Sequence, residues 1–518
     1  MRRGNRIGSW ALSSSDRELF FETDYLKNNL KGRSVRGGVL TLICQGILFL
    51  LQLLSIAVLA RFLTPEDYGL IAMVTAVIGF SSLFKNMGLL MATIQKETIT
   101  HEQVTALFWL NVLISILVAL MTSALAPLIA VFYGDERLTF IGIFLSLSFI
   151  FEGFAVQHQA LLRRQMRFVP LAIIPVIALI AGATSAVISA LMGASYWSLV
   201  IMILVKSFTN TVLVWFFCGW FPGGPARNAN IRELMLYGAN LTGFNVLNYF
   251  ARNLDDILIG KFCGASSLGI YNKAYGLLML PLSLINGPIA NVAIPALSRL
   301  QNEPESYKSY YCNALSLIAY MTFPMILGLT VMADEMVFLV LGPQWDGVSS
   351  IFIILAIAAF GQPIANANGW IYTSLGQTNR MFRWGLISVP VIVLGFIIGL
   401  PWGAIGVAAS YAVSANLIRI PGFWWAFRFS PINMRDLIHS IWRPAVSSFA
   451  MALTMFGVRL TLIRNTGSSS IILISCLVIG LIAFFITMLS LPNGRADMLK
   501  MMDMIKTISS SKDYDKTG

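Results

Sequence analysis

The stretch 234–262 carries an arginine and two aspartates, together with several amides, inside an otherwise apolar run. At about 100° per residue these side chains share one helix face: Thr242, Asn245, Asn248, Arg252, Asp255 and Asp256. Arg252 lies roughly ten residues from the end of the run, hence about 15 Å deep at ~1.5 Å per residue. It can pair with one acid at i+3 or i+4, which leaves the other as a candidate proton or cation site.

Four further ionisable residues lie inside apolar runs, where a charge is costly and usually faces a water-filled cavity. Lys206 has Asn210 one turn away, near the middle of its run, whereas Lys273 and Arg419 lie nearer opposite membrane faces. Glu152, late in its run, is either a cavity acid or an interfacial residue. The embedded set holds four cations and three acids, so a cavity lined by the cations would attract an anionic ligand.

Two adjacent carboxylates, Glu66 and Asp67, stand between apolar runs in the stretch ARFLTPEDYGL (Ala60–Leu70). Such a pair could serve acid–base catalysis. Together with Thr64 and Pro65 it also has the composition of a helix start, with a Thr cap, a first-turn proline and first-turn acids. We interpret it as a cap, because the same pattern recurs 200 residues later with two serines in place of the acids.

The remaining reactive side chains show no site pattern. The five cysteines are scattered, and three lie in apolar runs, which predicts buried thiols. The histidines, His101, His158 and His439, are far apart in predicted cytoplasmic loops. We expect no metal, no cofactor and no catalytic residue. The net charge is +12, but the basic residues form no stripe interleaved with aromatic residues. This pattern argues against nucleic acid as a partner.

The composition requires a membrane. The 518 residues are 57% hydrophobic and 12% charged, whereas a soluble domain has roughly 25% charged residues. Apolar runs of about 20 residues, enough to cross ~30 Å of hydrocarbon, recur along the chain. We predict an all-α polytopic membrane protein with 14 transmembrane helices. They are expected at 38–60, 69–89, 104–133, 138–157, 169–191, 195–219, 234–262, 268–297, 310–341, 348–376, 382–401, 403–427, 441–461 and 469–491.

Pro, Gly and Asn predict interruptions in two of these helices, at Ile285–Pro295 and at Gly361–Trp370. Tryptophans near the helix ends are typical of interfacial anchors, and they are Trp197, Trp220, Trp345, Trp402 and Trp442.

Basic residues predict the orientation, because cytoplasmic loops are rich in Lys and Arg. The tail before the first helix and alternate loops hold most of them, including the cluster Arg163, Arg164 and Arg167. The opposite loops hold only Arg61, Arg137, Lys261, Arg459 and Arg464. Both termini are therefore expected in the cytoplasm.

The chain also contains an internal repeat. Arg61-Phe62 matches Lys261-Phe262 and Gly69 matches Gly269, an offset of 200 residues, and Gly193-Ala194 matches Gly403-Ala404 at an offset of 210. We interpret helices 1–6 and 7–12 as two parallel-repeat six-helix lobes, with an extra C-terminal helix pair. The predicted domains are a tail at 1–36, an N-lobe at 37–220, a linker at 221–233, a C-lobe at 234–427, helices 13–14 at 441–491 and a tail at 492–518.

Three stretches resemble a known family. ARFLTPEDYGLIAM (60–73), ALLRRQMRF (160–168) and RNLDDILIGKFCGASSLGIYNKAY (252–275) are similar to the polysaccharide transporter branch of the multidrug/oligosaccharidyl-lipid/polysaccharide exporter superfamily. Within it the likeness is to Wzx-type lipid-linked oligosaccharide flippases of the colanic-acid-exporter kind, over about residues 35 to 495.

The resemblance implies a flippase for undecaprenyl-diphosphate-linked oligosaccharide repeat units, which serves exopolysaccharide, capsule or O-antigen synthesis in the bacterial inner membrane. Alternating access would be coupled to a gradient of H+ or Na+. The cations Arg252, Lys206, Lys273 and Arg419 would meet the diphosphate. Sugar hydroxyls would meet amides, and Asp255, Asp256 and Glu152 would be ion-coupling candidates. The amides are Gln45, Gln52, Asn210, Asn245 and Asn248. We expect a monomer among membrane lipids and leave association with polysaccharide assembly proteins open.

Two alternatives remain. The same fold can export another cargo, such as drugs or the lipid precursor of peptidoglycan, and the sequence separates these cargoes poorly. A membrane glycosyltransferase or polymerase would need a sizeable outer domain to position donor and acceptor. The outer connections expected here are too short for one.

Overall fold

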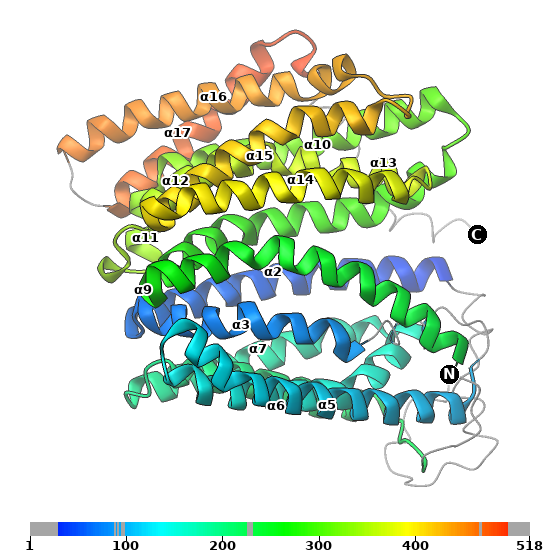
Figure 1. The fold of residues 1–518 in the computed structure, drawn as a ribbon. Helices are drawn as coiled ribbons and strands as arrows, with labels where there is room; N and C mark the ends of the chain where they lie inside the picture. Colours follow the sequence, from blue (N-terminus) through cyan, green and yellow to red (C-terminus); the bar gives the residue numbers. More distant parts are fainter. Residues whose placement is uncertain are drawn as a thin grey trace. The chain divides into compact units, whose positions relative to one another are not determined.

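The computed structural model describes residues 30–86, 90, 93–94, 99–224, 232–465 and 469–495 (Figure 1). Throughout these ranges the regular elements are α-helices and short 3-10 turns, without a strand. The elements are α2 (Leu30–Phe62), α3 (Pro65–Asn86), α5 (His101–Tyr133), α6 (Arg137–Arg164), α7 (Phe168–Leu191), α8 (Trp197–Cys218), α9 (Arg232–Arg299), α10 (Pro304–Val331), α11 (Ala333–Val340), η2 (Pro343–Trp345), α12 (Val348–Asn366), α13 (Asn368–Ser374), α14 (Thr378–Gly399), η3 (Leu400–Trp402), α15 (Gly403–Phe427), α16 (Met434–Asn465) and α17 (Ser469–Ser490). The expected all-α class is confirmed for this part of the chain.

Within the described ranges, 11 helical segments are long and apolar enough to cross a membrane. Two of them, Asn253–Arg299 and Thr378–Phe427, have 47 and 50 residues, whereas one crossing needs about 20. Large apolar side chains cover the outside of the helices; Met192 and Leu453, for example, are 81% and 73% exposed. Such a surface is unfavourable in water and suits hydrocarbon, so the chain is a multi-pass membrane protein.

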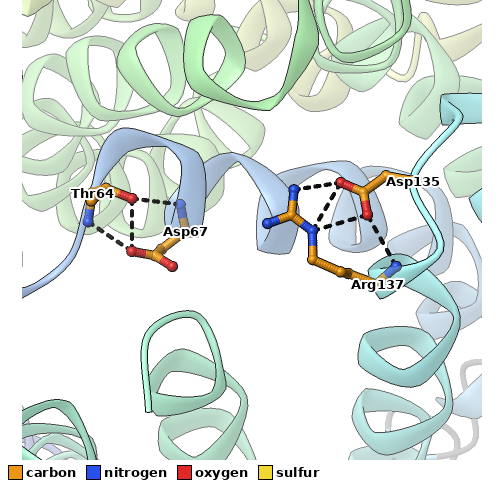
Figure 2. Close-up of polar contacts among 4 residues, drawn as sticks. All are labelled: Thr64, Asp67, Asp135 and Arg137. Atoms are coloured by element: carbon orange, nitrogen blue, oxygen red, sulfur yellow. Dashed lines mark hydrogen bonds and ion pairs between the residues drawn. The ribbon is translucent and has the colours of Figure 1, made fainter. Parts of the chain in front are cut away.

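The start of α3 follows from its own residues (Figure 2). The backbone N–H and the hydroxyl of Thr64 each donate to Oδ2 of Asp67 at 2.8 Å, and the N–H of Asp67 donates back to Thr64 Oγ1 at 3.3 Å. These bonds satisfy groups that the first helical turn leaves without a partner. The interpretation of Asp67 as part of a cap, rather than of a catalytic pair, is therefore confirmed.

Removal of the Thr64 hydroxyl is expected to destabilise the protein by about 1 kcal/mol, the usual cost of losing an N-cap. Thermal unfolding of Thr64→Ala in detergent measures this change. Glu66→Gln is the matched control, because it alters a charge in the same turn and leaves the Thr64–Asp67 bonds in place. Equal losses of stability in the two variants would contradict the capping role.

A glycine divides the long helix α9. Gly264 adopts φ 83° and ψ 174° inside it, so one segment ends there and a second begins at Ala265. This break lies between the helices predicted at 234–262 and 268–297. The two segments lie against each other after the break, since Tyr271 in the second hydrogen-bonds to Asp255 in the first.

One of the two predicted interruptions is confirmed. Ala367 separates α12 from α13 inside Gly361–Trp370. The interruption expected in Ile285–Pro295 is wrong, because α9 has helical backbone angles throughout this stretch although Pro288 and Pro295 lie inside it. Proline removes one amide donor, and membrane helices often absorb that loss without breaking.

Contacts within the chain form two units. The first unit contains α2 and the chain from Met73 to Asn253, which includes the start of α9. The second unit contains Leu63–Ala72 and the chain from Leu254 onward. In the first unit α6 packs against α5 and α8, and α7 packs against α2 and α8. Leu107, Phe108, Leu161 and Ile174 contribute to its buried core.

In the second unit, α15 packs against α12 and α14, while α16 packs against α10 and α17. One core cluster includes Tyr311 and Trp370, and another gathers Met451, Met455 and Cys476. Arg459 of α16 also pairs with Asp334 and Glu335 of α11, at 2.7 and 2.8 Å. Helices α16 and α17 are thus bound to the rest of this unit by apolar and ionic contacts.

Backbone features recur at the two offsets seen in the sequence. Helix α3 begins directly after Thr64, and the second segment of α9 begins directly after Gly264, an offset of 200. Left-handed residues and helix starts also recur at an offset of 210, and these pairs are Met166 and Gly376, Gly193 and Gly403, and Phe168 and Thr378. The agreement supports two copies of one helix order.

Candidate functional site

The two aspartates of α9 lie in the second unit and are half-buried. The Tyr271 hydroxyl donates to Asp255 Oδ2 at 2.9 Å, and the Asn272 amide donates to Asp256 Oδ2 at 3.5 Å. The other carboxylate oxygen of Asp255, Oδ1, is buried and has no hydrogen-bond partner among the residues whose side chains are described. Two adjacent carboxylates with a buried free oxygen form an arrangement that a proton or a small cation would stabilise.

Three predicted site residues precede this pair. The backbone of α9 is described through Asn245, Asn248 and Arg252 and is helical, but their side chains lie outside the described part. The pairing of Arg252 with one of the aspartates therefore stays a prediction. The bonds from Tyr271 and Asn272 to the aspartates were not predicted, because they depend on the break at Gly264.

Lys273, also in the second unit, is held by aromatic rings. Its Nζ lies 3.4 Å from the centroid of the Tyr68 ring and 5.9 Å from that of Trp345, and these two rings meet edge to face at 5.3 Å. Cation–π contacts of this kind hold an ammonium group without a carboxylate. Trp345 is fully buried, so its assignment as an interfacial anchor is wrong, and the sequence pattern did not point to Tyr68.

Arg419 on α15 is directed at the neighbouring helix α12. Its Nη2 donates to the carbonyl of Ala358 at 2.7 Å, and its Nη1 donates to Oδ1 of Asn416. A Cβ at Gly361 of α12 would overlap the guanidinium, so the glycine provides the space for it. This arginine therefore joins two helices through neutral acceptors and keeps its positive charge uncompensated by the carboxylates described here.

The first unit contains the other described polar candidates. Lys206 on α8 is more than a third exposed, while its Cβ packs against Gly182 of α7. Neither Lys206 nor Asn210 hydrogen-bonds to a residue that the structure describes. On α2, which packs against α7, Gln45 is half-buried and Gln52 is exposed. These side chains are available to a ligand, and the structure brings none of them into a hydrogen bond with another.

Glu152 is half-buried on α6 in the same unit. The next residue, Gly153, allows close approach of α5, because a Cβ there would overlap the side chain of Ser115. Asn111 and Ser115 on α5 are fully buried, and their polar side-chain atoms have no hydrogen-bond partner in the part of the chain that the structure describes. The residue that follows the acid therefore lies at a polar region of the α5–α6 interface.

Two histidines that were expected to be far apart in loops are neighbours of one tryptophan. His158 lies fully buried in α6, stacks on Trp215 at 4.2 Å and donates from Nε2 to the carbonyl of Trp220 at 3.1 Å. Trp220 Nε1 donates to Nδ1 of His101 at 3.1 Å. The expectation failed for His158 because α6 runs to Arg164, beyond the predicted end at residue 157. Trp220 is buried too and is not an interfacial anchor.

Two arginines that the sequence assigned to outer loops lie in helices α6 and α16 and are paired with acids. Arg137 Nη2 lies 2.7 Å from Asp135 Oδ2 (Figure 2), and hydrogen bonds from Arg137 hold the pKa of Asp135 below its ordinary value. Arg459 pairs with Asp334 and Glu335. These two positive charges are compensated locally, unlike those of Lys206, Lys273 and Arg419. No group of three or more His, Cys, Asp or Glu residues that could hold a metal occurs in the described ranges.

The chain is similar to proteins of surface-polysaccharide synthesis. It is 26% identical over 449 residues to the lipopolysaccharide biosynthesis protein WzxC of Escherichia coli strain K12, which covers 83% of this chain and 89% of that protein. It is also 26% identical over 415 residues to the teichuronic acid biosynthesis protein TuaB of Bacillus subtilis strain 168, covering 80% and 86%.

The fold is also found in solved structures. The lipid II flippase MurJ, in an inward closed conformation, has a TM-score of 0.70 at 14% identity and covers 87% of this chain and 98% of its own. At this identity the likeness concerns the fold alone. A family model described as "polysaccharide biosynthesis protein" matches residues 58–350. Since this match spans more than half of the chain, the protein belongs to the polysaccharide biosynthesis protein family.

Proposed function

We propose that this protein is a flippase that moves undecaprenyl-diphosphate-linked oligosaccharide repeat units across the bacterial inner membrane. The product would serve synthesis of an exopolysaccharide, a capsule or O-antigen. Family membership and the relatives WzxC and TuaB support a place in polysaccharide synthesis. The MurJ fold supports a transporter rather than a glycosyltransferase.

One observation carries the proposed cargo. Lys206, Lys273 and Arg419 lie within apolar helical segments, and none of them pairs with a carboxylate that the structure describes. A cation within a membrane-spanning segment is costly without a counterion unless a ligand or water compensates it. A lipid diphosphate would supply that compensation through charge-assisted hydrogen bonds. Arg252 would add a fourth cation to the set.

The architecture supports alternating access. We infer 14 transmembrane helices in two parallel-repeat six-helix lobes, at 37–220 and 234–427, followed by helices 13 and 14. The recurrence of helix starts at offsets of 200 and 210 residues supports this division. The asymmetry of basic residues between alternate loops supports cytoplasmic termini. Rocking of one lobe against the other would expose the site to each leaflet in turn.

Ion coupling is assigned to the acids. Asp255 and Asp256 are adjacent, and Glu152 is a separate candidate in the first unit. Binding of H+ or Na+ to the aspartates would relieve the repulsion between their carboxylates. No nucleotide would be needed, and we infer that a monomer suffices because both lobes belong to one chain.

Proteoliposomes that contain the purified protein test the cargo. A fluorescent polyprenyl-diphosphate oligosaccharide is expected to reach the opposite leaflet only when the protein is present, as measured by quenching with a membrane-impermeant reductant. The same lipid without its diphosphate is the matched control and is expected to stay in place, since the cations would lose their ligand. Lipid II and a cationic drug, tested in parallel, distinguish the other cargoes.

Transport of lipid II or of the drug in preference to the oligosaccharide lipid would assign the fold to that cargo. Equal movement of the lipids with and without diphosphate would contradict a cationic site.

A further inference from the structure

The first turns of α3 and of the second segment of α9 cross at a pair of glycines. A Cβ at Gly69 would overlap the backbone carbonyl of Ala265, and a Cβ at Gly269 would overlap the backbone carbonyl of Pro65. Both glycines are buried. Pro65 corresponds to Ala265, and Gly69 to Gly269, at the offset of 200. The glycine of each repeat therefore lies against the matching backbone carbonyl of the other repeat. The contact is therefore reciprocal.

A second contact forms at the same crossing. Tyr68 directly precedes Gly69, and Lys273 lies one turn beyond Gly269, so the 3.4 Å approach of Lys273 Nζ to the Tyr68 ring spans the two helices. Trp345 of η2 packs edge to face on Tyr68 at 5.3 Å. Leu63–Ala72 consequently groups with the second unit, although the chain on both sides of it belongs to the first.

We propose that this crossing is a closure of the transport path, and that Gly69 and Gly269 are the residues that allow it to form. The inference rests on the proposed flippase function, because a closure has a role only in a transporter that alternates between states. With the inferred orientation, the loops at Arg61 and Lys261 face outward, so the closure acts on the outer side.

The contacts at the crossing suit a joint that forms and separates. Helices with glycine at the interface approach closely through van der Waals packing and weak Cα–H···O contacts. A cation–π contact adds attraction without a buried ion pair. A side chain larger than hydrogen at either glycine would have to displace backbone.

A reversible bridge across the crossing tests the proposal. Glu66 and Ser266 directly follow the two contacting carbonyl residues, and both are exposed. In a background without the native cysteines, the pair Glu66→Cys and Ser266→Cys is bridged with a thiol-cleavable bifunctional reagent. Translocation of the polyprenyl-diphosphate oligosaccharide is expected to stop in the bridged protein and to return after reduction.

A control pair bridges two helices within one unit. Ser123 Oγ on α5 lies 2.8 Å from Ser146 Oγ on α6, and a bridge between Ser123→Cys and Ser146→Cys is expected to leave translocation unchanged. Full translocation through the protein bridged at 66 and 266 would overturn the closure. A lack of translocation in the unbridged protein would instead count against the proposed cargo, so the two failures are distinguishable.

The cross-linking yield between positions 66 and 266 tests the role of the two glycines. Gly69→Ala and Gly269→Ala are each expected to lower the bridging yield at 66 and 266, because the helices can no longer meet. Gly276→Ala is the control, since Gly276 lies in the same segment of α9 and a Cβ there would contact nothing. Unchanged yields in both glycine variants would overturn their role. If either variant fails to fold, the bridge in the protein with both glycines still decides the closure.

Discussion

Replacement of Lys206 by Gln is expected to slow translocation of a polyprenyl-diphosphate oligosaccharide about tenfold to a hundredfold. A hydrogen bond to a charged group contributes roughly 1.5–3 kcal/mol, and each ~1.4 kcal/mol is a factor of ten. Lys206 is exposed, and its ammonium group bonds to no residue in the described part of the chain. The loss should therefore come from the ligand rather than from the fold. Rates in proteoliposomes, together with unfolding in detergent, separate the two causes.

Two further variants sharpen this test. Lys206→Arg keeps the positive charge and is expected to retain most of the rate. Arg137→Gln removes a cation that already pairs with Asp135 at 2.7 Å, so it is expected to leave the rate unchanged. If Lys206→Gln translocates as fast as the wild type, Lys206 does not contact the cargo.

Arg419→Gln is expected to slow translocation and also to destabilise the protein. The guanidinium joins α15 to the carbonyl of Ala358 on α12, so its loss removes a contact within the second unit as well as a charge. Gly361→Ala keeps the charge but crowds the guanidinium out of this place. A loss of stability in Arg419→Gln without any change in the concentration of cargo needed for half-maximal rate would make Arg419 a packing residue only.

Replacement of Asp255 by Asn is expected to abolish the acceleration that an imposed ion gradient produces, while slow equilibration without a gradient persists. One oxygen of Asp255 accepts from Tyr271 at 2.9 Å, and the other is buried without a partner among the described side chains. An amide in its place neither binds a proton nor repels the carboxylate of Asp256. Binding of an ion would then relieve no repulsion between carboxylates, so the driving force for ion binding at this pair is lost. Translocation under proton and sodium gradients, each imposed separately, measures the effect and identifies the ion.

Tyr271→Phe is an intermediate case in this experiment. It keeps both carboxylates and removes the hydroxyl that positions Asp255, so it is expected to weaken the response to the gradient without abolishing it. Asp135→Asn is the control, since that acid lies between α5 and α6 and pairs with Arg137. A full gradient response in both Asp255→Asn and Asp256→Asn would exclude the two aspartates from ion coupling. Glu152 would then be the remaining candidate.

Much of the helical organisation could be predicted because local chemistry determines it. The hydroxyl and carboxylate of Thr64 and Asp67 are close in sequence, and the cap that they form is a property of the segment itself. Predictions failed where contacts with neighbouring helices determine the local structure. Pro288 and Pro295 did not interrupt α9, since the effect of a proline on a membrane helix depends on whether nearby groups satisfy the freed carbonyl.

The candidate site was predictable as a set of residues and not as an arrangement. Embedded cations and acids stand out in an apolar sequence because their burial is costly, and so Lys206, Lys273, Arg419 and Asp255 were proposed as site residues. Their partners were not, because Tyr271, Tyr68 and Trp345 are ordinary aromatic residues until the fold brings them close. The neighbouring positions of His101 and His158 around Trp220 were missed for the same reason.

The sequence by itself determined that the chain is helical and lies in a membrane, and that it repeats at offsets of 200 and 210 residues. These properties depend on hydrophobic run length and on local residue types. Only the tertiary structure decided that Gly69 lies against the carbonyl of Ala265 and Gly269 against that of Pro65. It also decided that Lys273 lies on Tyr68 and that Arg419 lies against α12. Contacts between helices distant in sequence depend on how closely backbones approach, and a linear pattern of residue types does not contain that distance.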